Sequence, residues 1–158
     1  MLRGSGKPLV KLERDEILPS LGQEQLWFLS KLEGTNAYNV PDGFVIDGPL
    51  DLAALSGALT DVVARHEAMR SLLVEEDGRL IVNVLPPAPV EVELEGLEST
   101  DEAAIRSWLE GKGLEPFDLA RDIPVRATAA ALPDGRHLLA LVMHHSATDG
   151  GSAPVVYR

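Results

Sequence analysis

The run Leu138–Met143 consists of six apolar residues with no polar residue among them. A strand with one side in solvent alternates apolar and polar residues, because successive side chains point to opposite faces. An unbroken apolar run of this length predicts a strand that is buried on both faces, in the middle of a sheet. The rest of the chain must then cover both sides of that sheet.

Three segments predict the helices that would provide this cover. Leu52, Leu55, Leu59, Val62 and Val63 recur at helical spacing after Asp51, which can cap the helix. Residues 20–34 and 99–113 each begin with a serine that is followed three residues later by glutamine or glutamate, the pattern of a capping box. The capping-box pairs are Ser20 with Gln23 and Ser99 with Glu102, and the core candidates of the first helix are Leu26, Trp27, Phe28, Leu29 and Leu32.

Turn signals predict two hairpins. Asp77-Gly78 separates two apolar runs within 71–87, and Pro133-Asp134-Gly135 separates residues 123–132 from the buried run. Shorter strands are expected at Phe44–Ile46 and, half-exposed, at Val90–Leu94. Because helices and hairpins occur in mixed order, the pattern favours an α+β fold with a mixed β-sheet covered by helices.

Composition excludes several classes of function. The 158 residues include 25 acidic and 14 basic side chains, a net charge of −11, which argues against nucleic acid and anionic membranes as partners. The chain has no cysteine, which excludes disulfides and thiolate metal sites. No apolar stretch approaches the ~20 residues of a membrane-spanning helix, and residues 1–19 resemble a linker or lead-in segment rather than a signal peptide. We therefore expect a cytoplasmic protein with one domain over residues 20–158.

The buried run is followed by the histidines His144 and His145, and then by Asp149-Gly150. Neighbouring residues of a strand point to opposite faces, so one histidine can face a cavity while the other packs inside. The same geometry argues against a zinc site that uses both imidazoles, and we expect no bound metal. Gly150 and Gly151 permit a sharp turn, and Asp149 can accept backbone N–H bonds or pair with an arginine.

These residues resemble a known family. His144–Gly150 reads HHSATDG and fits HHxxxDG, the pattern of chloramphenicol acetyltransferase-like acyltransferases. "LPSLGQEQLWFL" and "RHEAMRSLL" resemble the first and second core motifs of nonribosomal peptide synthetase condensation domains, usually SxAQxRLWxL and RHExLRTxF. The departures lie at Gly22, Gln25, Met69, Ser71, Leu73 and, after the third motif, Gly151.

The resemblance implies a peptide-bond-forming acyltransferase. In the family, an amine attacks a thioester, and both substrates are carried on the phosphopantetheine arms of donor and acceptor peptidyl carrier domains, with no intrinsic cofactor. The family's active histidine corresponds to His145, which could accept the proton of the amine or orient it. His144, Asp149, Gly150 and Arg70 would shape the site.

The resemblance implies a particular role in the site for Asp149 and another for Gly150. Asp149 would pair with an arginine, with Arg70 as the first candidate and Arg65 as the alternative. Gly150 would lie near the reacting atoms, where a side chain would obstruct the substrates. His66 of the second motif is expected to pack rather than to catalyse.

The resemblance also implies that the chain is the N-terminal subdomain of a two-subdomain unit, ending just inside a helix expected after Gly150. We expect it to fold but to be inactive without the C-terminal subdomain. Two alternatives stay open: an epimerisation or ester-forming relative, and a non-catalytic module that docks carrier proteins.

Overall fold

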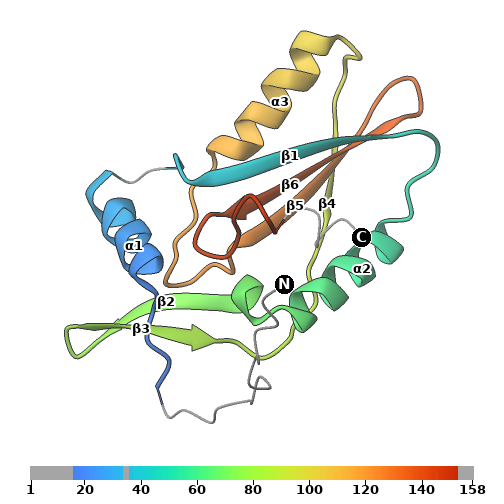
Figure 1. The fold of residues 1–158 in the computed structure, drawn as a ribbon. Coiled ribbons are helices and arrows are strands. Elements are labelled where there is room, and N and C mark those ends of the chain that lie inside the picture. Colours follow the sequence, from blue (N-terminus) through green and yellow to red (C-terminus); the bar gives the residue numbers. More distant parts are fainter. Residues whose placement is uncertain (1–15, 34–35, 153–158) are drawn as a thin grey trace, which may run out of the picture.

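The computed structural model describes residues 16–33 and 36–152 of the chain. Three α-helices, a short 3₁₀ helix and six strands occur in this part (Figure 1). In chain order they are α1 (Leu21–Glu33), β1 (Asn39–Ile46), α2 (Leu52–Arg65), the 3₁₀ helix (Glu67–Arg70), β2 (Ser71–Glu76), β3 (Arg79–Val84), β4 (Glu93–Gly96), α3 (Glu102–Leu114), β5 (Val125–Ala131) and β6 (His137–His144).

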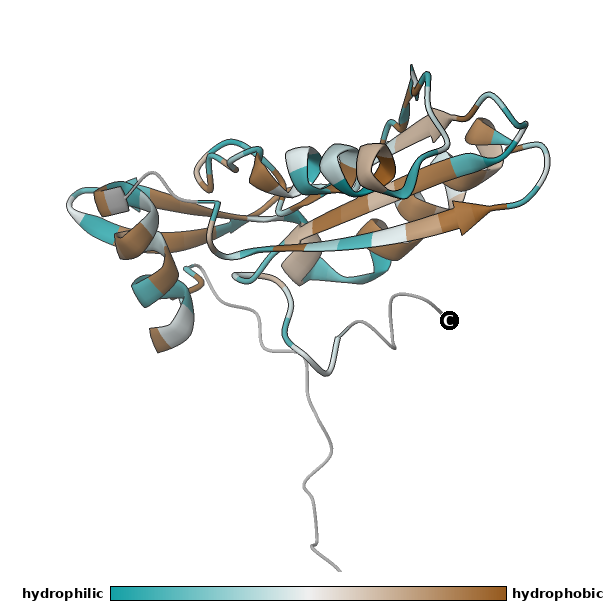
Figure 2. Cartoon of the chain, turned by 90° about the horizontal axis from the view of Figure 1, so that it is seen from above, coloured by the Kyte–Doolittle hydropathy of each residue, from teal (hydrophilic) through white to brown (hydrophobic). Residues whose placement is uncertain are grey.

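The apolar run forms β6, an inner strand of a four-stranded sheet with the order β1-β6-β5-β4. Strands β1 and β5 flank it in antiparallel orientation, while β4 pairs with β5 in parallel, so the sheet is mixed. Leu138 to His144 are all buried, which confirms the prediction of a strand covered on both faces. Figure 2 shows hydrophobic residues along the strands of this sheet.

The two faces of the sheet are covered by different helices (Figure 1). On one face, Leu139, Leu141 and Met143 pack in a cluster with α2. On the other face, Leu138 packs with Trp108 and other residues of α3. The alternation of side chains along β6 assigns odd-numbered residues to α2 and even-numbered residues to the opposite face. This arrangement confirms the predicted α+β fold.

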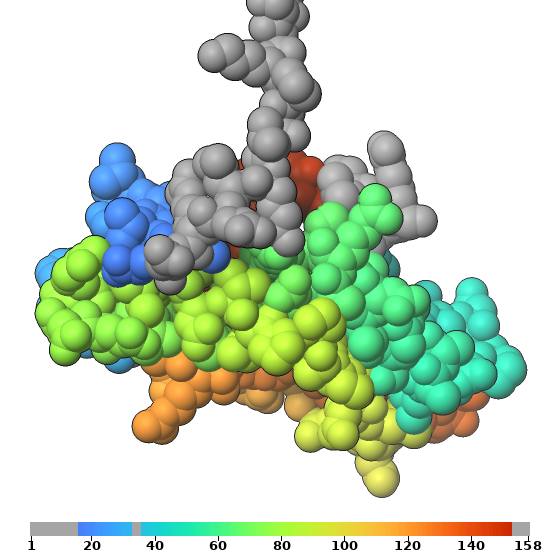
Figure 3. All heavy atoms as spheres, turned by 90° about the horizontal axis from the view of Figure 1, so that it is seen from below, coloured from blue at the N-terminus to red at the C-terminus, as the bar shows by residue number. Residues whose placement is uncertain are grey.

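The hairpin β2–β3 and helix α1 form a second unit beside the sheet (Figure 1). The Leu73 N–H donates to the Leu119 carbonyl at 2.8 Å, and the Val82 N–H donates to the Ile17 carbonyl at 2.8 Å. Trp27 of α1 packs against a cluster that includes Leu73. In Figure 3, the hairpin and α2 lie side by side on one face of the molecule.

The predicted turns and two of the predicted caps are confirmed. Asp77 and Gly78 have φ of 50° and 74°, and Gly135 has φ of 85°, as tight hairpin turns require. Asp51 accepts the N–H of Ala54 at 2.9 Å and caps α2. The capping box at the start of α1 is present, since Ser20 and Gln23 exchange two hydrogen bonds of 2.9 and 3.2 Å.

Four local predictions need correction. The Ser99–Glu102 capping box does not form, because α3 begins at Glu102 and the Ser99 hydroxyl bonds to Asp101 instead. The predicted core side of the first helix is partly wrong, since Phe28 is 56% exposed and Leu32 is 65% exposed. Two strands also differ in extent from their predictions: β1 begins at Asn39, and β4 covers Glu93–Gly96 rather than residues 90–94. The helix expected after Gly150 falls largely on residues outside the described part.

Candidate active site at the end of strand β6

His144 is the last residue of β6 and is buried, with 2% of its surface exposed. Its Nδ1 accepts the N–H of Ser146 at 3.1 Å, which places the proton of the neutral ring on Nε2. The ring of Phe117 meets the imidazole edge-on, with 6.1 Å between ring centroids. Burial, with a contribution from the nearby His145, lowers the pKa of His144 from 6.5 to about 4. His144 is therefore neutral at physiological pH and acts as a packed structural residue.

His145 lies just beyond the strand and is exposed. Its backbone N–H donates to the Tyr38 carbonyl at 2.9 Å, which extends the β1–β6 pairing by one residue. Its ring Nδ1 lies 2.6 Å from the Thr148 carbonyl, which can only accept a hydrogen bond. The neutral ring thus carries its proton on Nδ1 and keeps the Nε2 lone pair free of this contact. The opposite placement of the two histidines, expected from strand geometry, is confirmed.

His145 lines a cavity of about 720 Å³. Three segments far apart in sequence form its walls: the N-terminal part of α1, Tyr38, and the loop 145–152, which we call the histidine loop. Leu26 and Leu29 contribute apolar surface, and Gln23 contributes an amide. The imidazole thus meets a space with both apolar and hydrogen-bonding walls, as expected of a site for a small organic substrate.

Gln23 is a site residue that the sequence analysis did not identify. Its Nε2 donates to the Ser146 carbonyl at 3.2 Å, a contact between residues 123 positions apart. The capping-box pattern predicts the local role of Gln23, but a local pattern carries no information on a partner so distant in the chain. The first core motif is thereby joined directly to the third.

Asp149 stabilises the end of the histidine loop. Its Oδ1 accepts the Gly151 N–H at 3.0 Å and the Ser152 hydroxyl at 2.8 Å. The hydrogen bond from the Ser152 side chain, followed by the backbone bond from Gly151, lowers the pKa of Asp149. The carboxylate therefore stays ionised and closes a turn.

The expected pairing of Asp149 with an arginine is wrong for this structure. Among the described residues, neither Arg70 nor Arg65 forms an ion pair with Asp149. The Arg70 guanidinium instead donates to the Leu85 carbonyl and lies 3.6 Å from Glu67. Since the Leu85 N–H donates back to the Arg70 carbonyl at 2.9 Å, Arg70 ties the 3₁₀ helix to the segment after β3.

The environment of Gly150 gives no steric reason for a glycine. A Cβ atom built there would meet no heavy atom within 4 Å. His66 is partly buried and lines a second hollow, of about 470 Å³, together with Asp149 and Met69. The histidine loop separates this hollow from the cavity of His145, because Ala147, Asp149 and Ser152 line both.

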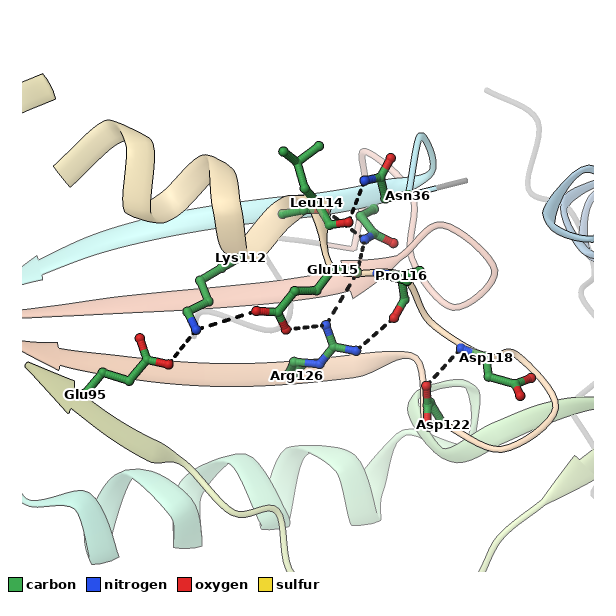
Figure 4. A network of polar contacts seen from close by, with 11 residues as sticks. Asn36, Glu95, Lys112, Leu114, Glu115, Pro116, Asp118, Asp122 and Arg126 are labelled. Atoms are coloured by element: carbon green, nitrogen blue, oxygen red, sulfur yellow. Dashed lines mark hydrogen bonds and ion pairs between the residues drawn. The ribbon is translucent and has the colours of Figure 1, made fainter. Parts of the chain in front are cut away.

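A polar network joins the segment around the start of β1 to the C-terminus of α3 (Figure 4). Asn36 Nδ2 donates to the Leu114 carbonyl at 2.5 Å, and Asn39 Nδ2 donates to the carbonyls of Gly113 and Glu115 at 2.8 Å each. The two asparagines thus cap the C-terminus of α3. Tyr38 lies between them, so its carbonyl is held in position for the His145 N–H.

The same network continues to the edge of the sheet through alternating charges (Figure 4). Lys112 Nζ lies 2.6 Å from Glu95 and 3.5 Å from Glu115, and Arg126 Nη1 lies 3.2 Å from Glu115. The hydrogen bond with Lys112, followed by that with Trp108, lowers the pKa of Glu95. The network links α3 to β4 and β5.

Comparison with known proteins identifies the family. A family model described as "Condensation domain" matches residues 13–158. The chain belongs to the condensation-domain family. This confirms the identification made from the three motifs.

Relatives of this condensation-domain chain are peptide synthetases. The chain is 43% identical over 146 residues to a probable non-canonical nonribosomal peptide synthetase, CymA, of Salinispora arenicola, covering 91% of this chain and 2% of that protein. It is 38% identical over 154 residues to chondramide synthase of Chondromyces crocatus, covering 93% of this chain and 4% of that protein. The chain thus spans a small part of the length of these relatives.

The fold of this chain also occurs in solved structures. The X-domain from teicoplanin biosynthesis is 29% identical with a TM-score of 0.84, over 94% of this chain and 32% of that one. The first condensation domain of the CDA synthetase is 30% identical with a TM-score of 0.73, over 90% of this chain and 38% of that one. The chain corresponds to about a third of each.

The described residues contain neither a candidate metal cluster nor a candidate membrane span. No group of three or more histidine, aspartate or glutamate side chains there is placed to hold a metal ion. In the same ranges, no helix has the length and apolar character needed to cross a membrane.

Proposed function

We propose that the chain forms the histidine-bearing part of a condensation domain that joins a carrier-bound acyl thioester to a carrier-bound amine. The observation that carries this proposal is the state of His145. Its Nδ1 is committed to the Thr148 carbonyl at 2.6 Å, and its ring lines a cavity of about 720 Å³. An imidazole held in this tautomer offers Nε2 to a substrate.

In the proposed reaction, the amine nitrogen of the acceptor attacks the thioester carbonyl carbon of the donor. The new C–N bond forms, the C–S bond breaks, and the thiolate leaves on its phosphopantetheine arm. The proton of the attacking amine passes to His145 Nε2 and then to the thiolate. This transfer leaves a free thiol and returns His145 to its neutral form. The carbonyl of Thr148 stabilises the imidazolium through the Nδ1 proton.

The other residues have supporting roles in this proposal. His144 anchors the start of the histidine loop in the core, and Asp149 closes its end through Gly151 and Ser152. Arg70 acts at a distance by fixing the 3₁₀ helix that borders the second hollow. Gly150 leaves room for a substrate or for a segment of the rest of the domain.

We propose further that the domain needs the remaining subdomain for turnover. Two features support this. The chain covers 32–38% of the two solved relatives described above, and His145 itself is exposed. The upstream and downstream carrier domains would then deliver their arms to a cavity whose other walls come from the second subdomain.

The test uses a complete condensation domain containing this chain, with donor- and acceptor-loaded carrier proteins and intact-mass detection of the amide. His145→Ala is expected to slow amide formation by about 10²- to 10⁴-fold, the usual contribution of a positioned acid–base group. His137→Gln is the control, because His137 lies at the opposite end of β6. Wild-type rates in His145→Ala would refute the catalytic role of His145.

A second candidate function is a binding module without turnover. The observation in its favour is the likeness to the teicoplanin X-domain, which is also known in a complex with OxyB; that structure is 29% identical with a TM-score of 0.85. Carrier binding by the complete wild-type domain, with no amide formed from any loaded pair, would favour this function over condensation.

A further inference from the structure

The histidine loop is held mainly by bonds between its own residues and His144. The Ala147 N–H donates to the His144 carbonyl, the Ser146 N–H donates to the His144 ring, and Asp149 closes the far end. For residues 146–152, one hydrogen bond reaches a side chain elsewhere in the part of the chain that the structure describes. It is the bond from Gln23 Nε2 to the Ser146 carbonyl.

The surroundings fix which end of the Gln23 amide faces the loop. At one end, the Ser20 N–H is a donor and requires an oxygen, which Gln23 Oε1 provides at 2.9 Å. At the other end, the Ser146 carbonyl is an acceptor and requires an N–H, which Nε2 provides at 3.2 Å. The amide of Gln23 satisfies both partners at once, because it carries one acceptor oxygen and one donor nitrogen.

We propose that Gln23 is a positioning residue that fixes the distance between the α1 wall of the cavity and the His145 ring. The Ser146 carbonyl belongs to the peptide unit between Ser146 and Ala147, in the turn that connects His145 to Thr148. A displacement of this carbonyl shifts that turn, and with it the Thr148 carbonyl that holds the His145 Nδ1 at 2.6 Å. Gln23 is itself held by the cap of α1, and α1 carries Leu26 and Leu29 of the opposite wall. The part of this proposal that concerns catalysis rests on the proposed function.

A role limited to helix capping makes different predictions, and three variants separate the two. Ser20→Ala removes the hydroxyl that accepts the Gln23 N–H at 3.2 Å but leaves the bond to Ser146. Gln23→Glu keeps an acceptor for the Ser20 N–H but has no N–H for Ser146. Gln23→Met removes both the acceptor for the Ser20 N–H and the donor to the Ser146 carbonyl, and it adds no charge.

The first experiment measures the histidine loop in the 158-residue chain by NMR. Gln23→Met and Gln23→Glu are expected to raise the amide exchange rates of residues 147–152 by about tenfold. They are also expected to increase the share of His145 rings protonated on Nε2. Ser20→Ala is expected to change both readouts by less than twofold. Equal changes in Ser20→Ala and Gln23→Met, or no change in either Gln23 variant, would overturn the proposal.

The second experiment measures amide formation by the complete condensation domain with the same variants. Both Gln23 variants are expected to lower kcat by about tenfold with an unchanged KM for the loaded carriers, since carrier docking is not involved. A KM effect alone would overturn the positioning role. If the NMR changes occur but His145→Ala retains full amide formation, the proposed function fails while the link between Gln23 and the histidine loop stands.

Discussion

His144 and His145 are adjacent in sequence but belong to two regions with different construction. The end of β6 around His144 is part of the core, where the imidazole packs against Phe117 and is 2% exposed. The histidine loop from His145 to Ser152 is at the surface and depends on short-range hydrogen bonds and on Gln23. The difference indicates that the first region supplies stability, while the second presents the His145 ring that the proposed function uses.

The largest expected effect on stability follows from His144→Ala. The variant loses buried volume next to Phe117 and leaves the Ser146 N–H without its acceptor. We expect the free energy of unfolding to fall by about 3 kcal/mol, measured by urea denaturation of the 158-residue chain. His145→Ala is the matched control and is expected to change it by less than ~0.5 kcal/mol, because the side chain is exposed. Similar losses in both variants would show that the two regions do not differ in this way.

A smaller loss of folding stability is expected when the pH is lowered from 7 to 5. The pKa of His144 is about 4 in the folded chain and near 6.5 in the unfolded chain. Below pH 6.5 the unfolded state therefore binds a proton that the folded state excludes, and stability falls until the pH reaches the folded pKa. Between pH 7 and pH 5 we expect a loss of about 2 kcal/mol, while most carboxylates stay ionised.

The matched measurement for this pH effect is denaturation of His144→Gln across the same range. This variant lacks the titrating group, so its stability is expected to change much less between pH 7 and pH 5. A parallel decline in both proteins would assign the pH effect to other groups and would contradict the buried, neutral state of His144.

The smallest effect concerns Arg70. Arg70→Met removes the bond from a guanidinium, 12% exposed, to the Leu85 carbonyl, and we expect a loss of about 1–2 kcal/mol. Because Arg70 and Asp149 form no ion pair here, the double variant with Asp149→Asn is expected to show additive effects in denaturation. A clear coupling between the two sites would restore the pairing that the sequence motifs suggest.

Local and repeating patterns predicted much of the fold. The unbroken run that forms β6, the Asp51 cap and the two hairpin turns depend on residues close in sequence, where sterics and hydrogen-bonding capacity leave few alternatives. The Ser99–Glu102 capping box was also predicted from residues close in sequence, but it does not form. Asp101 competes for the Ser99 hydroxyl at a shorter separation, and α3 starts one residue after Asp101.

The candidate site was only partly predictable. Strand alternation predicted that the two histidines point to opposite faces, and the family resemblance assigned the inner position to His144 and the site to His145. The partners of Arg70 and Gln23 were not predictable, because each depends on a segment brought near by folding: residue 85 after β3 in one case and residue 146 after β6 in the other.

The sequence by itself determined the central strand, the helices that cover it, the family and the opposite orientations of the two histidines. These follow from periodicity and from motifs, which are properties of residues near one another in the chain. Only the tertiary structure decided that Gln23 reaches the histidine loop, that Arg70 does not reach Asp149, and that Tyr38 supports His145. Each of these contacts needs a particular distance between elements, and that distance is set by packing of the whole core rather than by any one segment.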